Sequence, residues 1–132
     1  RDQVQEVLAS GGDVVWVESD QMIDAVTAVS GSGPAYVFRF IEAMMASAKH
    51  LGLDEIQAKR LTLATLAGAT ELATQSTDPV STLRERVTSK GGTTAQALSV
   101  LESQQFEQII RAAMQAAYDR AGELSRELDR QG

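Results

Sequence analysis

The sequence lacks the residues on which several classes of site depend. It has no cysteine, two prolines and one histidine among 132 residues, which excludes a disulfide framework and a thiolate metal site. The lone His50 provides no paired imidazole ligands for a transition metal. No apolar run approaches the roughly 20 residues that span a bilayer, and the first residues lack a signal-peptide pattern. We therefore expect a soluble, cytoplasmic protein with no metal site and no membrane contact.

The charge balance limits the classes of partner. The formal net charge is -6, and the basic residues are spread along the chain. This disfavours nucleic acid as a partner, because phosphate binding needs a basic surface. Hydrophobic residues make up 43% and charged residues 23% of the chain, a composition typical of globular proteins. A chain of this length is also long enough to bury one core.

From residue 20 onward, the apolar spacing predicts helices only. Aspartate and serine cap free backbone N–H groups, and proline is tolerated in a first helical turn. These start signals are Asp20, Pro34, Asp54, the pair Asp78-Pro79, and Ser103. The predicted buried face of the helix after Asp54 comprises Ile56, Leu63, Leu66, Ala67, Thr70 and Ala73. The last helix carries the longest apolar stripe: Phe106, Ile109, Ile110, Ala113, Met114, Ala117, Ala121, Leu124 and Leu128. The expected fold class is all-α, mainly helical.

Residues 1–19 have a different pattern. Val4, Val7 and Leu8 share a helical face that ends at Gly11-Gly12, and residues 13–18 form a β-branched and aromatic run typical of a strand. One helix and one strand make no sheet, and an isolated strand has an unpaired edge. We expect this segment to be a helix-strand remnant of a larger α/β domain, or to pair with a second copy of the chain.

The helices are rich in alanine, which lets helix backbones approach closely. Residues 64–73 and 112–117, for example, each contain four alanines. Because apolar residues also extend beyond one narrow stripe of the last helix, we expect self-association through these faces. A tightly packed monomeric bundle is the alternative.

Two glycine-rich corners are candidate binding sites. The first, residues 31–35, lacks the third glycine of a dinucleotide fingerprint and follows no predicted strand, so we interpret it as a sharp turn with close helix packing. The second, residues 89–94, opens a helix, where free N–H groups and the helix dipole attract an anion. Thr93 or the residue just before it caps this helix, and Thr93 with Gln96 matches a capping box. The alternative is therefore a helix start that binds nothing.

The second corner lies in a longer motif. Residues 87–98 (Val-Thr-Ser-Lys-Gly-Gly-Thr-Thr-Ala-Gln-Ala-Leu), followed by Val-Leu-Glu at 100–102, closely resemble the signature of the pyrroline-5-carboxylate reductase family. Residues 22–38 (Met-Ile-Asp-Ala-Val-Thr-Ala-Val-Ser-Gly-Ser-Gly-Pro-Ala-Tyr-Val-Phe) resemble the domain junction and first long helix of the same family. Both segments occur in the family's order and spacing, and the resemblance covers essentially the whole chain.

The resemblance implies a two-domain enzyme that reduces 1-pyrroline-5-carboxylate to L-proline, the last step of proline biosynthesis. Such enzymes have an N-terminal Rossmann domain for NADPH or NADH and a C-terminal helical domain that dimerises by interleaving helices. Residues 20–132 would be the dimerisation and substrate-binding domain, and residues 1–19 the C-terminal remnant of a truncated Rossmann domain. We expect the fragment to be inactive alone, to bind no cofactor, and to form a homodimer or a ring of such dimers.

The resemblance also assigns the substrate site. It implies that Ser89, Gly91, Gly92 and Thr93 hold the substrate carboxylate, largely through backbone N–H groups, and that the Thr94 hydroxyl hydrogen-bonds the ring nitrogen during reduction. The motif departs from the family at residue 90, where a lysine replaces a frequent proline; it loses loop rigidity and adds attraction for a carboxylate. The alternative function is a helical oligomerisation module of another Rossmann-type reductase or dehydrogenase, with no ligand of its own.

Overall fold

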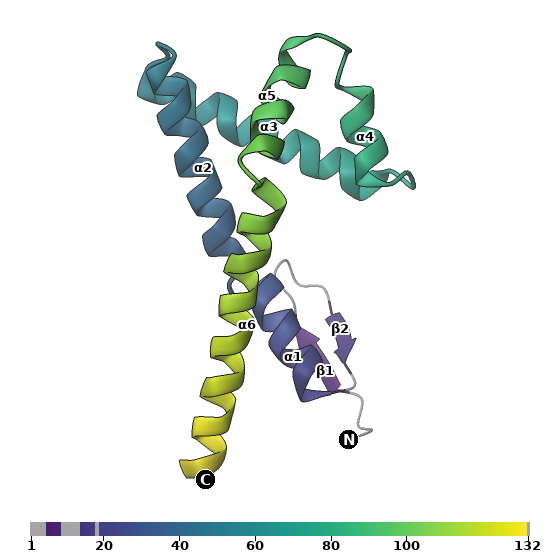
Figure 1. Ribbon diagram of the computed structural model, residues 1–132, viewed down its shortest axis with the longest axis vertical. Helices are drawn as coiled ribbons and strands as arrows, with labels where there is room; N and C mark the ends of the chain where they lie inside the picture. The colour runs from purple at the N-terminus through teal and green to yellow at the C-terminus, as the bar shows by residue number, and fades with distance from the viewer. Residues whose placement is uncertain (1–4, 9–13, 18, 132) are drawn as a thin grey trace. The chain divides into compact units, whose positions relative to one another are not determined.

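The computed structural model describes residues 5–8, 14–17 and 19–131. Its elements, shown in Figure 1, are β1 (Gln5–Leu8), β2 (Val14–Val17), α1 (Asp20–Val26), the π-helical turn η1 (Thr27–Gly31), α2 (Gly33–His50), α3 (Glu55–Gln75), α4 (Val80–Arg86), α5 (Thr93–Ser103) and α6 (Phe106–Gln131). The predicted helical fold class is confirmed. Among the helices described, none is both long enough and apolar enough to cross a membrane.

The chain divides into two compact units. The first unit comprises Arg1–Phe38 and Glu107–Gly132, and the second comprises Arg39–Phe106. Within the first unit, α1 approaches α6 closely at Gly122, where a Cβ atom would lie 3.5 Å from Oδ2 of Asp24. The second unit contains the later part of α2 with α3, α4 and α5.

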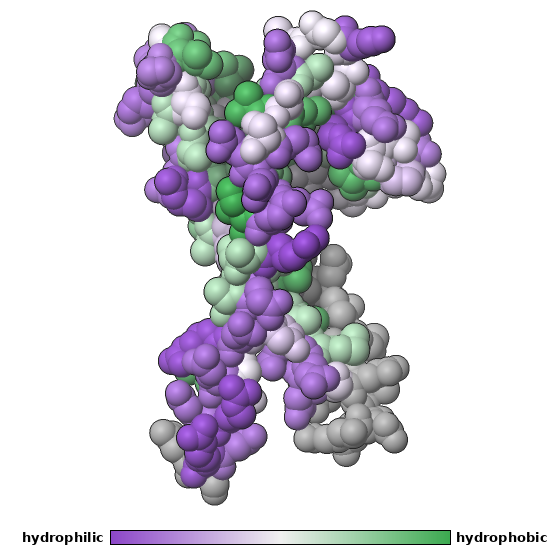
Figure 2. Space-filling model, in the orientation of Figure 1, coloured by the Kyte–Doolittle hydropathy of each residue, from purple (hydrophilic) through white to green (hydrophobic). Residues whose placement is uncertain are grey.

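Very little of the chain is buried by its own residues. Among the described residues, only Ala28, Ala58 and Thr62 are buried. The predicted buried face of α3 is therefore only partly right for the single chain. Leu66 and Ala73 are half-buried, but Ile56 is 67% exposed, and the two buried residues of α3, Ala58 and Thr62, lie outside the predicted set. Figure 2 shows hydrophobic side chains open to solvent on the face that carries α2, α3 and α5. The buried residues are small, whereas many of the larger apolar side chains are exposed.

The N-terminal segment forms a hairpin, so the helix predicted there is wrong at residues 5–8. β1 pairs antiparallel with β2, and Gln5 lies opposite Val17 and Leu8 opposite Val14. The strand predicted at residues 13–18 is confirmed as Val14–Val17. The backbone groups of β1 gain partners in the β-branched run of β2, and this pairing outweighs the weak helical periodicity of a short segment. The predicted helix end at Gly11-Gly12 lies outside the described residues.

Two predicted helix starts are displaced. Ser19, rather than Asp20, caps α1, and its Oγ accepts the Met22 N–H at 3.2 Å. Ser103 caps no helix: it is the last residue of α5, and its hydroxyl donates to the Val100 carbonyl. The chain then turns at Gln105, whose φ of 60° is left-handed, before α6 begins. Serine hydroxyls commonly bond back to a carbonyl of the preceding helical turn, and the Val100 carbonyl accepts the Gln104 N–H as well.

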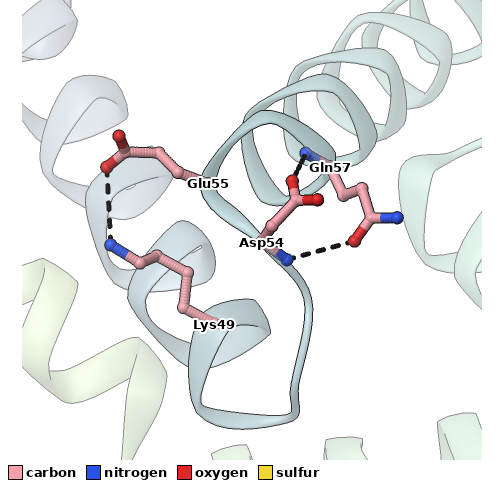
Figure 3. A network of polar contacts seen from close by, with 4 residues as sticks. All are labelled: Lys49, Asp54, Glu55 and Gln57. Carbon is pink, nitrogen blue, oxygen red and sulfur yellow. Dashed lines mark hydrogen bonds and ion pairs between the residues drawn. The ribbon is translucent and has the colours of Figure 1, made fainter.

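The predicted start at Asp54 is confirmed and is reinforced by a capping box (Figure 3). Oδ1 of Asp54 accepts the Gln57 N–H at 2.8 Å, and Oε1 of Gln57 accepts the Asp54 N–H at 3.1 Å. Nζ of Lys49, in the last turn of α2, lies 3.4 Å from Oε1 of Glu55. Gly52, with a φ of 108°, makes the turn between the two helices. These contacts join α2 to α3.

Substituting Asp54→Ala should lower the free energy of unfolding by about 1 kcal/mol, because both reciprocal hydrogen bonds of the capping box are lost. Urea denaturation at one fixed protein concentration measures this change. Asp129→Ala, which removes an exposed carboxylate within α6, is the matched control and should leave the midpoint unchanged. Equal midpoints for the two variants would contradict the role of the cap.

Candidate functional site

The candidate site begins where α4 ends. The Thr88 hydroxyl donates to the Arg84 carbonyl at 2.6 Å and closes the last turn of α4. Nη2 of Arg86 lies 2.7 Å from Oδ2 of Asp78, so the two ends of α4 are tied by an ion pair. The loop that follows therefore begins at the end of a short helix whose two ends are held by these contacts.

The two glycines shape this loop for different reasons. Gly91 has a φ of 73°, a conformation that costs most side chains strain. Gly92 is extended, and its N–H donates to the Ser89 carbonyl at 3.0 Å. A Cβ atom at Gly92 would lie only 3.3 Å from that carbonyl oxygen. Gly91 is thus favoured by its positive φ, and Gly92 by the close approach of the Ser89 carbonyl.

The start of α5 is free of any side-chain cap, so the predicted Thr93–Gln96 capping box is wrong, whereas the predicted alternative of an N-cap at the residue before Thr93 is confirmed. Gly92 is the N-cap, and Thr93 is already the first helical residue. The Gln96 N–H bonds the Gly92 carbonyl at 3.2 Å as the first helical hydrogen bond. The earlier N–H groups have no partner within a helix, and they point outward at its positive end. This arrangement suits a small anion.

The structure brings the predicted site residues together in one continuous loop. Ser89, Gly91 and Thr93 are exposed, while Gly92 and Thr94 are half-buried. Lys90, also exposed, makes no ion pair with any described residue. A carboxylate at the helix start would meet backbone N–H groups, hydroxyls and one unpaired cation, which together can bind and orient it.

The other candidates from the sequence contribute no such site. Gly31 ends the π-helical turn η1 and Gly33 begins α2, and a Cβ atom at Gly33 would meet nothing within 4 Å. The close helix packing predicted for that corner is therefore wrong; the backbone geometry of the turn itself explains the bend. His50 ends α2. In residues 5–8, 14–17 and 19–131, no cluster of acidic or histidine side chains could hold a metal.

Comparison with known proteins decides the family. A family model described as pyrroline-5-carboxylate reductase dimerisation matches residues 20–124. The chain belongs to the pyrroline-5-carboxylate reductase family. A pyrroline-5-carboxylate reductase of Haemophilus influenzae is 45% identical over 121 residues, covering 91% of this chain and 45% of that protein. One of Pseudomonas aeruginosa is 42% identical over 127 residues, covering 96% and 46%. The chain spans less than half the length of these relatives.

Solved structures agree with the family. A pyrroline-5-carboxylate reductase of Coxiella burnetii matches with a TM-score of 0.81 and 44% identity, covering 83% of this chain and 41% of that one. A pyrroline carboxylate reductase of Plasmodium falciparum, described with NADP bound, matches with a TM-score of 0.76 and 36% identity, covering 78% and 39%. These comparisons give no support to the alternative of an oligomerisation module from another reductase family.

Two features of the site were not predicted. The sequence identifies Gly91-Gly92, but the structure shows that only Gly91 of the two has a positive φ. The second feature is the absence of a side-chain cap on α5, which follows because the N-cap is Gly92 rather than Thr93. The signal for it was the glycine before Thr93, because glycine is itself an accepted N-cap residue.

Gly91→Ala should destabilise the chain by about 1 kcal/mol, because alanine is strained at positive φ. Asparagine tolerates that conformation better, so Gly91→Asn should lose less. Thermal unfolding of the two variants at equal concentration measures the difference. A Gly91→Asn variant that melts below Gly91→Ala would show that backbone strain does not explain the glycine.

Proposed function

We propose that this chain is the dimerisation and substrate-binding part of an NAD(P)H-dependent enzyme that reduces 1-pyrroline-5-carboxylate to L-proline. The observation that carries the proposal is the uncapped start of α5, which lies within the motif that the chain shares with its family. A helix start of this type binds carboxylates well, and the proposed substrate carries one.

The loop from Ser89 to Thr93 would hold the substrate through its carboxylate. The Gly91-Gly92 backbone has no side chains that keep a ligand away. The free N–H groups of the first turn of α5 lie at the positive end of the helix dipole. Lys90 adds a positive charge that has no acidic partner among the described residues. Holding the carboxylate at a fixed point places the five-membered ring beside Thr94.

Thr94 would act on the ring nitrogen. Its position in the first turn of α5 puts its hydroxyl one residue beyond the proposed carboxylate contacts. A hydroxyl both donates and accepts, so it can hydrogen-bond the nitrogen as imine and as amine. A nicotinamide cofactor supplies the hydride when bound. We assign its site to the part of the full-length enzyme that this chain does not span. The work of this chain is positioning and charge placement.

The exposed apolar faces favour an interleaved homodimer, in keeping with a family of dimerisation domains. Large side chains of the α6 stripe are open, including Ile109 at 59% and Leu128 at 69% exposure. A groove of about 580 Å³ in the second unit is lined by Phe40, Met44, Leu51, Leu61, Thr62 and Leu101. Apolar surface of this extent is stable in water only when covered. A second copy of the chain supplies helices with matching apolar stripes.

In the full-length reductase, Thr94→Val should lower kcat about 10²-fold, because the hydroxyl that contacts the reacting nitrogen is lost. KM should change much less, since the carboxylate contacts remain. Steady-state kinetics with pyrroline-5-carboxylate measures both. Thr88→Val is the matched control: its hydroxyl already bonds the Arg84 carbonyl, so kcat should stay near the wild-type value. Wild-type kcat in Thr94→Val would exclude this role for Thr94.

Ile110→Glu, in the apolar stripe of α6, should convert the chain from a dimer to a monomer or an unfolded chain, because it would bury an unpaired carboxylate. Sedimentation equilibrium combined with circular dichroism distinguishes these states. Gln108→Glu introduces the same charge on the opposite face of α6 and should leave the dimer intact. A folded wild-type monomer at micromolar concentration would refute the interleaved dimer.

A further inference from the structure

The loop before α5 carries a single charge. Lys90 is the only charged residue in the stretch 87–101. Its side chain is exposed, and it makes no ion pair with any residue that the structure describes. By contrast, Nη2 of Arg86, at the end of α4, lies 2.7 Å from Oδ2 of Asp78. The charge of Lys90 is therefore not neutralised within the described part of the chain.

The backbone of this loop explains its glycine but not its lysine. The hydrogen bond from the Gly92 N–H to the Ser89 carbonyl closes a four-residue turn in which Lys90 is the second residue. The third residue, Gly91, has the positive φ of 73° that a type II turn requires, and the φ of Lys90 is not positive. The second position of such a turn accepts many residues and favours proline. Nothing in the turn geometry requires a lysine there.

The charge lies close to the proposed anion site. Lys90 is two residues before Gly92, the N-cap of α5, so the two Cα atoms are at most about 8 Å apart. This separation is comparable to the Debye length of about 8 Å at physiological ionic strength. An anion at the start of α5 therefore experiences the lysine charge together with the helix dipole. The chain as a whole has a net charge of -6, which by itself repels anions.

The net charge of the ligand changes during the reaction that we propose, and the inference rests on that proposed function. A cyclic imine is a weaker base than a secondary amine. At mildly alkaline pH the imine nitrogen of 1-pyrroline-5-carboxylate is uncharged, so the carboxylate makes the substrate an anion. Reduction adds a hydride to the imine carbon and a proton to the nitrogen, and the more basic amine then takes up a second proton. The product L-proline is therefore a zwitterion without net charge.

We propose that Lys90 is a specificity-determining residue that favours the anionic substrate over the zwitterionic product at the start of α5. For the substrate, nothing offsets the attraction between the lysine ammonium and the carboxylate. For L-proline, repulsion of the ring ammonium largely cancels that attraction. One charge about 8 Å from a ligand in water changes binding about twofold to threefold. Lys90 thus reduces inhibition by accumulated product without touching the reacting atoms.

The test compares two ring carboxylates as inhibitors of the full-length reductase at low ionic strength. Cyclopentanecarboxylate has the ring and the carboxylate but no nitrogen, so it is an anion, whereas L-proline is a zwitterion. In Lys90→Gln, we expect KM for pyrroline-5-carboxylate and Ki for cyclopentanecarboxylate to rise about twofold to threefold. Ki for L-proline and kcat should stay at their wild-type values. Lys90→Arg should behave as wild type, and the differences should vanish near about 0.5 M KCl, where the charge is screened.

Two further variants separate the charge from other effects. Lys90→Pro removes the same charge but suits the second position of the turn, so it should reproduce the constants of Lys90→Gln. Lys59→Gln is the matched control for net charge. Lys59 is an exposed cation of α3 that makes no ion pair with a described residue, and its loss should leave all four constants unchanged.

Several results would overturn the proposal. An equal rise of both Ki values in Lys90→Gln would mean that the lysine holds the carboxylate by contact and does not distinguish substrate from product. A rise that persists at high salt, or that Lys59→Gln reproduces, would exclude a local charge effect. Unchanged constants in an enzyme that reduces pyrroline-5-carboxylate would refute this inference alone. A full-length protein that does not reduce pyrroline-5-carboxylate would refute the proposed function and this inference with it.

Discussion

Coverage of apolar helix faces is the constraint on which the rest of the structure depends. Only three of the described residues are buried by the chain itself, although a chain of this length normally buries most of its apolar surface. The local bonds, such as the capping box at Asp54, determine where helices begin and end. They contribute about 1 kcal/mol each, which cannot offset the conformational entropy of so many ordered residues. Membership of a dimerisation-domain family is consistent with this imbalance.

The same constraint explains which parts of the fold could be predicted from the sequence. Helix boundaries depend on nearby residues, so the start at Asp54 could be predicted, and the starts at Asp20 and Ser103 were displaced by only one to three residues along the chain. Burial depends on what lies opposite a helix. The α3 prediction assumed that large residues face inward, but Ile56 is open in the single chain and Ala58 is covered. The hairpin was missed for a related reason, because its pairing lies between segments rather than within one.

The candidate site was readable because its information is local. Ser89 to Thr94 form one loop, so the motif and the geometry coincide. The predicted capping box placed the N-cap at Thr93, one residue later than in the structure, and this difference has a chemical consequence. If the Thr93 side chain capped the helix, it would occupy an N–H group that an anion needs. With Gly92 as the N-cap, those groups stay open, and the loop suits a ligand better than the sequence alone indicated.

The two glycine corners show why residue type alone does not distinguish a binding loop from a joint. At Gly91-Gly92, the chain leaves one helix and starts another, so unpaired N–H groups accumulate. At Gly31-Gly33, a π-turn leads almost directly from one helix to the next, and the unsatisfied group is instead a carbonyl, which Tyr36 engages. An excess of donors attracts an anion, whereas a displaced carbonyl needs a donor from the protein. The free groups at the start of α5 are therefore open to a ligand, whereas the Ala28 carbonyl in η1 finds its donor within the chain.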